Sequence, residues 1–300
     1  MPTIPVVMIV AIRWRVMAVP EKELLKRLDQ QDRIFLRHYE QYLDQIMNVV
    51  EALLERHYTM QQIVGMPFFA AGRLGELLTG HSQDVLAMGQ AHAAIVVQDL
   101  HRQFAAVKLA NDWHPWFMQD IHLAGPFTVD PEQFWLDPVA ALQALELREN
   151  MLAGDVEGRL WHNVKEIMIQ HLKDGNRKRT ISEMTELANV NMRRAELITT
   201  TESTYVYNRG RLAGYHDAEV DYLLFSAVID SRTSRQCRSR HGLVVRMGSA
   251  EMSANTPPLH GRCRSVWSPL FSRYQSELIT SKSTDWSEVA SLPKGWKVAA

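Results

Sequence analysis

A regular seam of apolar side chains runs through the N-terminal part of this chain. Between Glu21 and Tyr58 these residues recur at steps of seven, four, three, four, three and four. Such steps place them on one face of a long helix, at close to coiled-coil spacing, with charged residues off that face. The members of the seam are Leu28, Phe35, Tyr39, Tyr42, Ile46, Val49 and Leu53. We interpret its aromatic members as core residues and not as a ligand cage.

An alanine-rich stretch from Ser82 to Asn111 predicts a second long helix. Its residues for packing against the first helix are Val85, Met88, Ile95, Leu100, Phe104 and Val107. Residues 65–80 would connect the two helices as a loop or a short helix. We therefore expect residues 17–112 to form a domain built as a hairpin of long helices.

The first sixteen residues hold a short apolar run followed by Arg13 and Arg15. The run is too short to span a bilayer, and its charges follow it, so neither a membrane helix nor a secretory signal fits. Translation could start at Met17 as well as at Met1. We interpret residues 1–16 as a flexible arm that docks on a neighbour, or as a misassigned start.

Aromatic residues and prolines interrupt the helical pattern between Trp113 and Pro138. Residues 112–138 contain three Trp, three Phe and four Pro. This mixture does not build a regular element, and it predicts an ordered loop that packs or docks. Residues 113–150 would then be a connector and a helix start, or else a surface for a partner.

Helical signals return in the second half of the chain. An apolar face is formed by Leu160, Val164, Ile167, Met168 and Leu172. Gly175 follows as the expected C-terminal cap. The sequence from Thr180 to Glu183 has the form of a capping box that opens a short helix, and Asn191 or a neighbour is expected to open the next one.

Two short apolar stretches predict strands. Residues 221–230 suit a buried strand, and residues 243–247 are its expected partner. Helices combined with a small sheet indicate an α+β fold for residues 151–270, followed by a tail at 271–300. The expected fold class of the whole chain is therefore α+β, with a mainly helical N-terminal half.

The net charge of −1 hides an asymmetry between the two halves. Residues 17–150 carry 10 basic and 18 acidic side chains, whereas residues 151–275 carry 18 and 13. Between positions 232 and 264 there are seven arginines and one acid, Glu251. Such a segment can contact phosphates or an acidic protein surface, and the alternative is a solvated loop. The candidate contacts to DNA or a partner are Arg235, Arg238, Arg240 and Arg262.

The chain has only two cysteines, and each has a histidine close by in sequence. The four candidate metal ligands are Cys237, His241, His260 and Cys263. Two thiolates and two imidazoles suit tetrahedral zinc, but the spacing is not that of a standard zinc finger. The alternatives are a disulfide bridge, or two buried free thiols beside a hydrogen-bonded histidine. The sequence favours the buried thiols.

Several ordered motifs in this region coincide with those of a known family. Asp230, Arg232 and Thr233 end the predicted strand, Cys237 follows, and a glycine leads into the next strand. The C-terminal motif consists of Pro257, Pro258, His260, Cys263 and Arg264, and the upstream helix carries Thr201, Glu202 and Asn208. This pattern, over about residues 150–270, resembles the phage head morphogenesis (Mu F-like minor head protein) family.

The resemblance implies a minor head protein that is associated with the portal in few copies and acts in head assembly and in DNA packaging or ejection. Its partners would be the portal and the coat or scaffold protein, with genomic double-stranded DNA as a further candidate and no membrane during assembly. It would reside in the virion, and in the host cytoplasm during assembly. Many members carry additional cysteines where this chain has Ser234 and Ser265. For this reason we expect no cofactor and no stoichiometric metal, with zinc as the candidate if one is bound.

An enzyme is the alternative: a metal-assisted hydrolase or transferase with Glu202 and His260 as catalytic groups and the cysteines around a metal. The sequence has no Gly-rich phosphate loop, no H-E-x-x-H and no G-x-S-x-G. We favour the structural interpretation, in which Glu202 pairs with an arginine such as Arg232 and the motif residues form one rigid unit.

Overall fold

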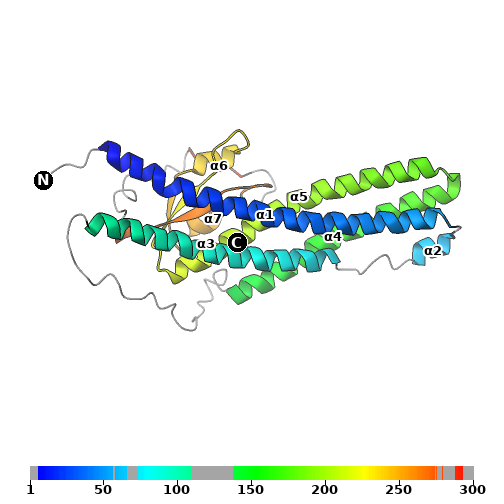
Figure 1. Cartoon of the computed structure of the whole chain (residues 1–300), viewed down its shortest axis with the longest axis horizontal. Coiled ribbons are helices and arrows are strands. Elements are labelled where there is room, and N and C mark those ends of the chain that lie inside the picture. The colour runs from blue at the N-terminus through cyan, green and yellow to red at the C-terminus, as the bar shows by residue number, and fades with distance from the viewer. Residues whose placement is uncertain are drawn as a thin grey trace. The chain divides into compact units, whose positions relative to one another are not determined.

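The computed structural model describes residues 6–56, 58–65, 73–109, 138–273, 275, 279 and 288–292, and most of them are helical (Figure 1). In chain order the elements are α1 (Val6–Leu54), α2 (Met60–Gly65), α3 (Arg73–Leu109), α4 (Pro138–Asp174), α5 (Arg177–Asp217), β1 (Tyr222–Ser226), α6 (Arg235–Arg240), β2 (Val244–Arg246), α7 (Ala250–Asn255) and β3 (Val266–Leu270). The predicted α+β fold class is confirmed. The aromatic connector at 113–137 and most of the tail at 271–300 lie outside the described residues. No helix within the described ranges combines the length and apolar character that crossing a membrane requires.

The chain divides into two compact units that do not follow a linear division of the sequence. The first unit comprises residues 1–29, 85–141 and 201–300, and the second comprises residues 30–84 and 142–200. Each unit therefore draws helical segments from both halves of the chain. Helix α1 also continues without a break through the boundary at 16/17, where the sequence indicated an arm or a second start.

The second unit has an apolar core of helical segments. Phe35, Tyr39, Tyr42 and Ile46 of the predicted seam are buried in it, which confirms that part of the seam. At the end of the seam the prediction is wrong, because Val49 is 37% exposed and Val50 is buried instead. An α-helix has 3.6 residues per turn, so a face spaced at 3.5 drifts away from the core.

The other predicted helix faces are also confirmed in part. Val85, Leu100, Leu160, Val164 and Met168 are buried. In contrast, Ile95 and Leu172 are 46% and 38% exposed. Part of the apolar face of these helices is therefore not covered by neighbouring elements.

Polar contacts join α3 to the other helices inside the second unit. His81 Nε2 of α3 lies 3.2 Å from Asp32 Oδ1 of α1, and both side chains are buried. The amide of Leu74, at the start of α3, donates to the buried carboxylate of Glu157 from α4 at 2.8 Å. The Glu157 carboxylate therefore satisfies one of the amide groups that a helix start leaves without an intrahelical partner.

Helix α4 ends as the sequence predicted. Gly175 has a φ of 63°, and its amide donates to the carbonyl of His171 at 2.8 Å. This is a left-handed C-terminal cap, which favours glycine because glycine has no Cβ.

The predicted start of two separate helices after Gly175 is wrong, because α5 runs unbroken from Arg177 to Asp217. Asn176 caps its start, with its side-chain oxygen accepting from the amide of Arg179 at 3.1 Å. The Thr180 hydroxyl donates to the carbonyl of Asn176, and the Asn191 amide donates to the carbonyl of Leu187. These short polar side chains therefore bond within the helix and do not open a new one.

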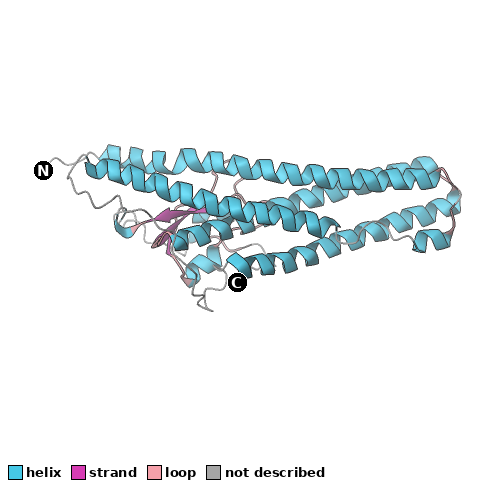
Figure 2. Cartoon of the chain, turned by 60° about the horizontal axis from the view of Figure 1, so that its bottom comes forward, coloured by secondary structure: helices cyan, strands magenta, loops and turns pink. Residues whose placement is uncertain are grey.

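The first unit contains a three-stranded antiparallel sheet in the order β2-β1-β3 (Figure 2). The β1–β2 pairing confirms the two strands that the sequence predicted. Sequence reasoning missed β3, which contains Pro269. Proline cannot donate to a strand ladder, and the position of β3 at the edge of the sheet is one where a strand tolerates it.

Helices α3 and α5 approach each other closely within the first unit, at Gly89 and Gly210. A Cβ placed on Gly89 would lie 2.5 Å from the carbonyl oxygen of Tyr207, and one placed on Gly210 would overlap the carbonyl oxygen of Leu86. Both obstacles are backbone atoms, which cannot rotate away. Glycine is therefore required at this crossing for the two backbones to meet.

Directly after Gly210 on α5, Arg211 is fully buried in a network of aromatic hydroxyl groups. Its Nε donates to the Tyr215 hydroxyl at 2.9 Å, and Tyr215 donates in turn to the carbonyl of Trp267 on β3 at 3.2 Å. Arg211 Nη1 also lies 3.3 Å from the Tyr207 hydroxyl, which is 2.9 Å from Nδ1 of His92. Burial and the charge of Arg211 lower the pKa of His92 to about 4, so its imidazole is neutral at pH 7.

Candidate functional site

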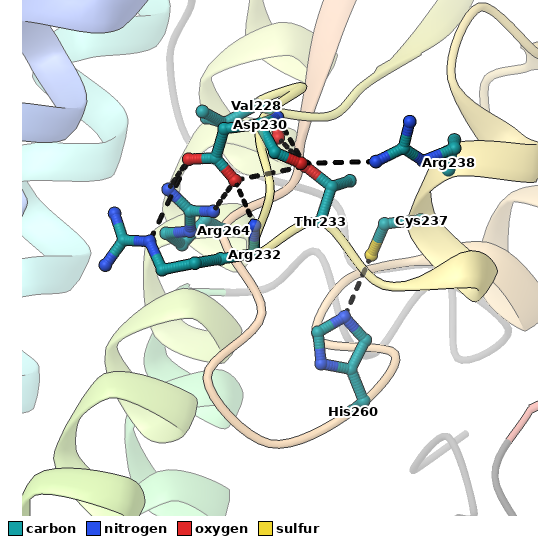
Figure 3. A network of polar contacts seen from close by, with 8 residues as sticks. All are labelled: Val228, Asp230, Arg232, Thr233, Cys237, Arg238, His260 and Arg264. Carbon is teal, nitrogen blue, oxygen red and sulfur yellow. Dashed lines mark hydrogen bonds and ion pairs between the residues drawn. The ribbon is translucent and has the colours of Figure 1, made fainter.

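The segment that follows β1 is a turn built by its own side chains. The amide of Asp230 donates to the Thr233 hydroxyl at 2.7 Å, and the amide of Arg232 donates to Asp230 Oδ1 at 2.9 Å (Figure 3). The Thr233 hydroxyl also donates to the carbonyl of Val228. Asp and Thr favour such turns because their short side chains reach nearby backbone groups.

Arg264 fastens this turn to the chain just before β3. Its two terminal nitrogens lie 2.8 and 2.7 Å from the two carboxylate oxygens of Asp230, which is a bidentate ion pair. Hydrogen bonding to Arg264 holds the pKa of Asp230 well below its usual range. Arg238 of α6 adds a bond to the carbonyl of Asp230 at 3.2 Å. Asp230 thereby connects the end of β1, α6 and the start of β3.

One face of α5 holds the segment that leads into β3. The Thr201 hydroxyl accepts from the amide of Arg262 at 3.0 Å, and the Thr204 hydroxyl donates to the carbonyl of Cys263 at 2.5 Å. Asn208 donates to the carbonyl of Ser265 at 3.1 Å and accepts from the amide of Trp267 at 3.1 Å. The spacing i, i+3 and i+7 places these three side chains on one helical face.

Cys237, His260 and Cys263 meet beside this framework. The Cys237 sulfur contacts His260 Nε2 (Figure 3), at a distance of 3.1 Å. It also lies 3.6 Å from the Cys263 sulfur. Cys237 stands in the first turn of α6, where its amide donates to the hydroxyl of the capping Ser234 at 3.2 Å. His260 donates from Nδ1 to the carbonyl of Gly261 at 2.8 Å, which leaves Nε2 to face the thiol. Both cysteines are free and buried.

These contacts shift the pKa values of the two thiols in opposite directions. Hydrogen bonds from Cys263, His260, Ser265 and Ser234 outweigh burial and lower the pKa of Cys237 to about 4. The same bond to Cys237, together with burial, raises the pKa of the Cys263 thiol well above its ordinary value. The pKa of His260 is raised by its hydrogen bond to Cys237. The contacts therefore favour the thiolate form of Cys237, the protonated form of His260 and the thiol form of Cys263.

Other residues that the sequence singled out lie apart from this cluster. His241 accepts from the amide of Ala227 through Nδ1 at 3.1 Å and is not one of the three grouped ligands. Glu202 is buried on α5, and its carboxylate is not part of the group either. Pro257 and Pro258 are joined by a cis peptide bond and are buried. Arg232 is 77% exposed, and its charge lies near Asp230.

The four candidate contact arginines fall into two classes. Arg235, Arg238 and Arg262 are exposed. The prediction is wrong for Arg240, which is 5% exposed and enclosed by protein groups. It donates to Asn255 Oδ1 at 2.7 Å and to the carbonyl of Ala290 at 2.7 Å, so it is unavailable to a phosphate.

Sequence reasoning missed Thr204 and Asn255 as structural residues. For Thr204 a signal was present, because Thr201, Thr204 and Asn208 share one helical face. For Asn255 there was no local signal, because its contact with Arg240 joins residues that lie on different short helices.

The fold and the site together define a mainly helical protein in which buried hydrogen bonds from α5 hold the segment that leads into the small sheet. Residues 162–268 match the sequence model of the family described as "Phage Mu protein F like protein". This match confirms the resemblance over that segment, and at the level of the family it supports a phage head morphogenesis protein. No curated protein and no solved structure matches the chain.

Proposed function

We propose that this chain is a minor head protein of a tailed phage, acting with the portal in head assembly and in DNA packaging or ejection. The observation that carries this proposal is the match of residues 162–268 to the Mu F-like family. The portal and the coat or scaffold protein are the proposed partners. The proposed location is the virion, reached through the host cytoplasm during assembly.

The use of the motif residues supports a structural role. Asp230 and Arg264 satisfy each other in a bidentate pair, and Asn208 bonds two backbone groups of the segment 265–267. Side chains whose polar atoms are bonded to other groups of the same chain stabilise one arrangement of that chain. A catalytic group, in contrast, must be placed where a substrate can reach it.

The alternative enzyme would need access to the thiol cluster. Cys237 and Cys263 are 2% and 1% exposed. Glu202, the proposed acid or base, does not join the cluster. We therefore propose that the protein is not an enzyme.

The proposal is tested in a phage that encodes this chain, by quantitative mass spectrometry of procapsids and mature heads. The chain should be found in both, in few copies relative to the coat protein, and should copurify with the portal. Its absence from both kinds of particle would reject the role of a head protein.

A substitution in the same phage distinguishes a structural role of Glu202 from a catalytic one. Glu202→Gln keeps the shape of the side chain and removes its ability to exchange a proton. We expect these particles to assemble with normal composition and to infect nearly as well as wild type. Normal particles whose infectivity falls by about a thousandfold, within the range expected for loss of a general acid or base, would favour the catalytic alternative.

The exposed arginines of the first unit support double-stranded DNA as a further proposed partner. Changing Arg235, Arg238 and Arg262 to alanine should weaken binding to duplex DNA of any sequence. Each lost phosphate contact lowers the salt slope by about 0.9, so the slope should fall by about 3. Retention of labelled DNA across a salt series measures this slope.

A charge-matched triple variant controls for net charge. Arg73, Arg159 and Arg177 are exposed arginines of the second unit, and changing them to alanine removes the same charge. We expect this control to bind DNA nearly as the wild type does. Equal salt slopes for the wild type and the first triple variant would show that these arginines are not the contact.

A further inference from the structure

We propose that Cys237, His260 and Cys263 bind a zinc ion that fastens α6 to the segment before β3. In the described part of the chain, the three ligand atoms all lie within 4.8 Å of one another. The sequence favoured a metal-free protein because Ser234 and Ser265 stand where relatives carry cysteines. Because the structure brings three ligand atoms together, we propose a bound zinc ion instead. This proposal does not depend on the proposed role in the phage head.

The separations between the ligand atoms fit a tetrahedral ion. Zinc holds a thiolate at about 2.3 Å and an imidazole nitrogen at about 2.0 Å, which places two sulfurs about 3.8 Å apart and sulfur and nitrogen about 3.5 Å apart. In this protein the two sulfurs are 3.6 Å apart, and the Cys237 sulfur is 3.1 Å from His260 Nε2. Shifts of a few tenths of an ångström would therefore bring Cys237 into place against each of the other two ligands. The third pair, Cys263 Sγ and His260 Nε2, lies within 4.8 Å.

Each ligand is also held in the orientation that a metal needs. His260 donates from Nδ1 to a backbone carbonyl, an arrangement common for metal-binding histidines because it directs the other nitrogen to the ion. The backbone of Cys263 is fixed by the Thr204 hydroxyl, and that of Cys237 by Ser234. Helix α6 thus presents Cys237, and the segment between α7 and β3 presents the other two ligands.

Burial and ligand chemistry favour a structural zinc ion over other cations. Two thiolates and an imidazole are soft and borderline ligands, which suit zinc and do not suit magnesium or calcium. The two sulfurs are almost completely buried, which keeps a bound ion away from substrates and favours a structural role. Three protein ligands leave one tetrahedral position for a water molecule. Binding needs Cys263 as a thiolate and His260 as a neutral imidazole, so it releases the thiol proton of Cys263 and any proton held on His260 Nε2.

Two other fates of the thiols are distinguished by experiment. A Cys237–Cys263 disulfide would require the sulfurs to approach to about 2.05 Å and two electrons to pass to an external oxidant. Permanently free thiols would react with a thiol reagent after unfolding and would hold no metal. Either state, found in protein purified under reducing conditions, contradicts the proposal.

The full chain, purified with reductant and without chelator, should contain about one equivalent of zinc by elemental analysis. Cys237→Ser and Cys263→Ser should each lose it. His241→Gln is the matched control, because His241 lies in the same sequence segment but outside the group, and it should keep the full equivalent. Zinc content below about a tenth of an equivalent in the wild type, or full retention by both serine variants, would overturn the site.

Cobalt substitution keeps the test decisive if the serine variants fail to fold. Wild-type protein stripped by a chelator and given Co²⁺ should show the thiolate-to-metal charge-transfer absorption of a tetrahedral sulfur site. Added Zn²⁺ should abolish this absorption by displacing cobalt. A featureless cobalt spectrum from folded wild-type protein with titratable thiols would reject the proposal.

Discussion

Gly210→Ala should lower the free energy of unfolding of the first unit by about 3 kcal/mol. A methyl group at this position would overlap the carbonyl oxygen of Leu86, which belongs to the backbone of α3. The strain can be relieved only by moving α3 and α5 apart, and this movement would loosen the packing around Arg211 and Leu212. Denaturant unfolding monitored by circular dichroism, with hydrogen exchange of residues 201–217, measures the loss.

Gly158→Ala is the matched control for this experiment. Gly158 also lies inside a long helix, α4, but a Cβ placed on it would meet nothing within 4 Å. Alanine is the better helix former, so this variant should be more stable than wild type by about 0.5–1 kcal/mol. If Gly210→Ala were also stabilising, α3 and α5 would not cross at backbone contact.

Asn208→Leu should destabilise the first unit by about 4 kcal/mol. Leucine has a similar size but cannot accept from the amide of Trp267 or donate to the carbonyl of Ser265. Both groups would remain buried without these partners, and each would cost about 1–3 kcal/mol. The same unfolding measurement reports the change, and hydrogen exchange at Trp267 should rise with it.

Asn191→Leu controls for the change of residue type on the same helix. Asn191 is also buried, but its side chain donates to the carbonyl of Leu187 within α5. Its loss leaves no distant backbone group without a partner, so the cost should be within about 1 kcal/mol. Equal effects of the two substitutions would show that Asn208 contributes only as a helix residue.

Local patterns accounted for much of the fold. The apolar seam predicted the core face of α1, Gly175 predicted the end of α4, and the two apolar stretches predicted β1 and β2. Each of these features depends on contacts between residues close in sequence, or on a periodicity that repeats over a long helix.

The misplaced helix starts show where local reasoning fails. Thr180 and Asn191 are residue types that favour helix starts, but in α5 both bond to carbonyls four residues earlier. The same short polar side chains can cap a helix start or bond to a carbonyl inside a helix. Packing along the whole helix decides which of the two occurs. Strand β3 was missed because its pairing with β1 joins residues 40 to 48 positions apart.

The sequence by itself determined the two strands β1 and β2, the residue types of the thiol cluster and the family resemblance, since each depends on short motifs. The tertiary structure decided which histidine accompanies the cysteines and which arginines are exposed. His260 joins the cluster and His241 bonds to Ala227, whereas Arg240 is buried against Asn255. These outcomes depend on contacts between elements that are distant in sequence, and only the packing of the chain brings those elements together.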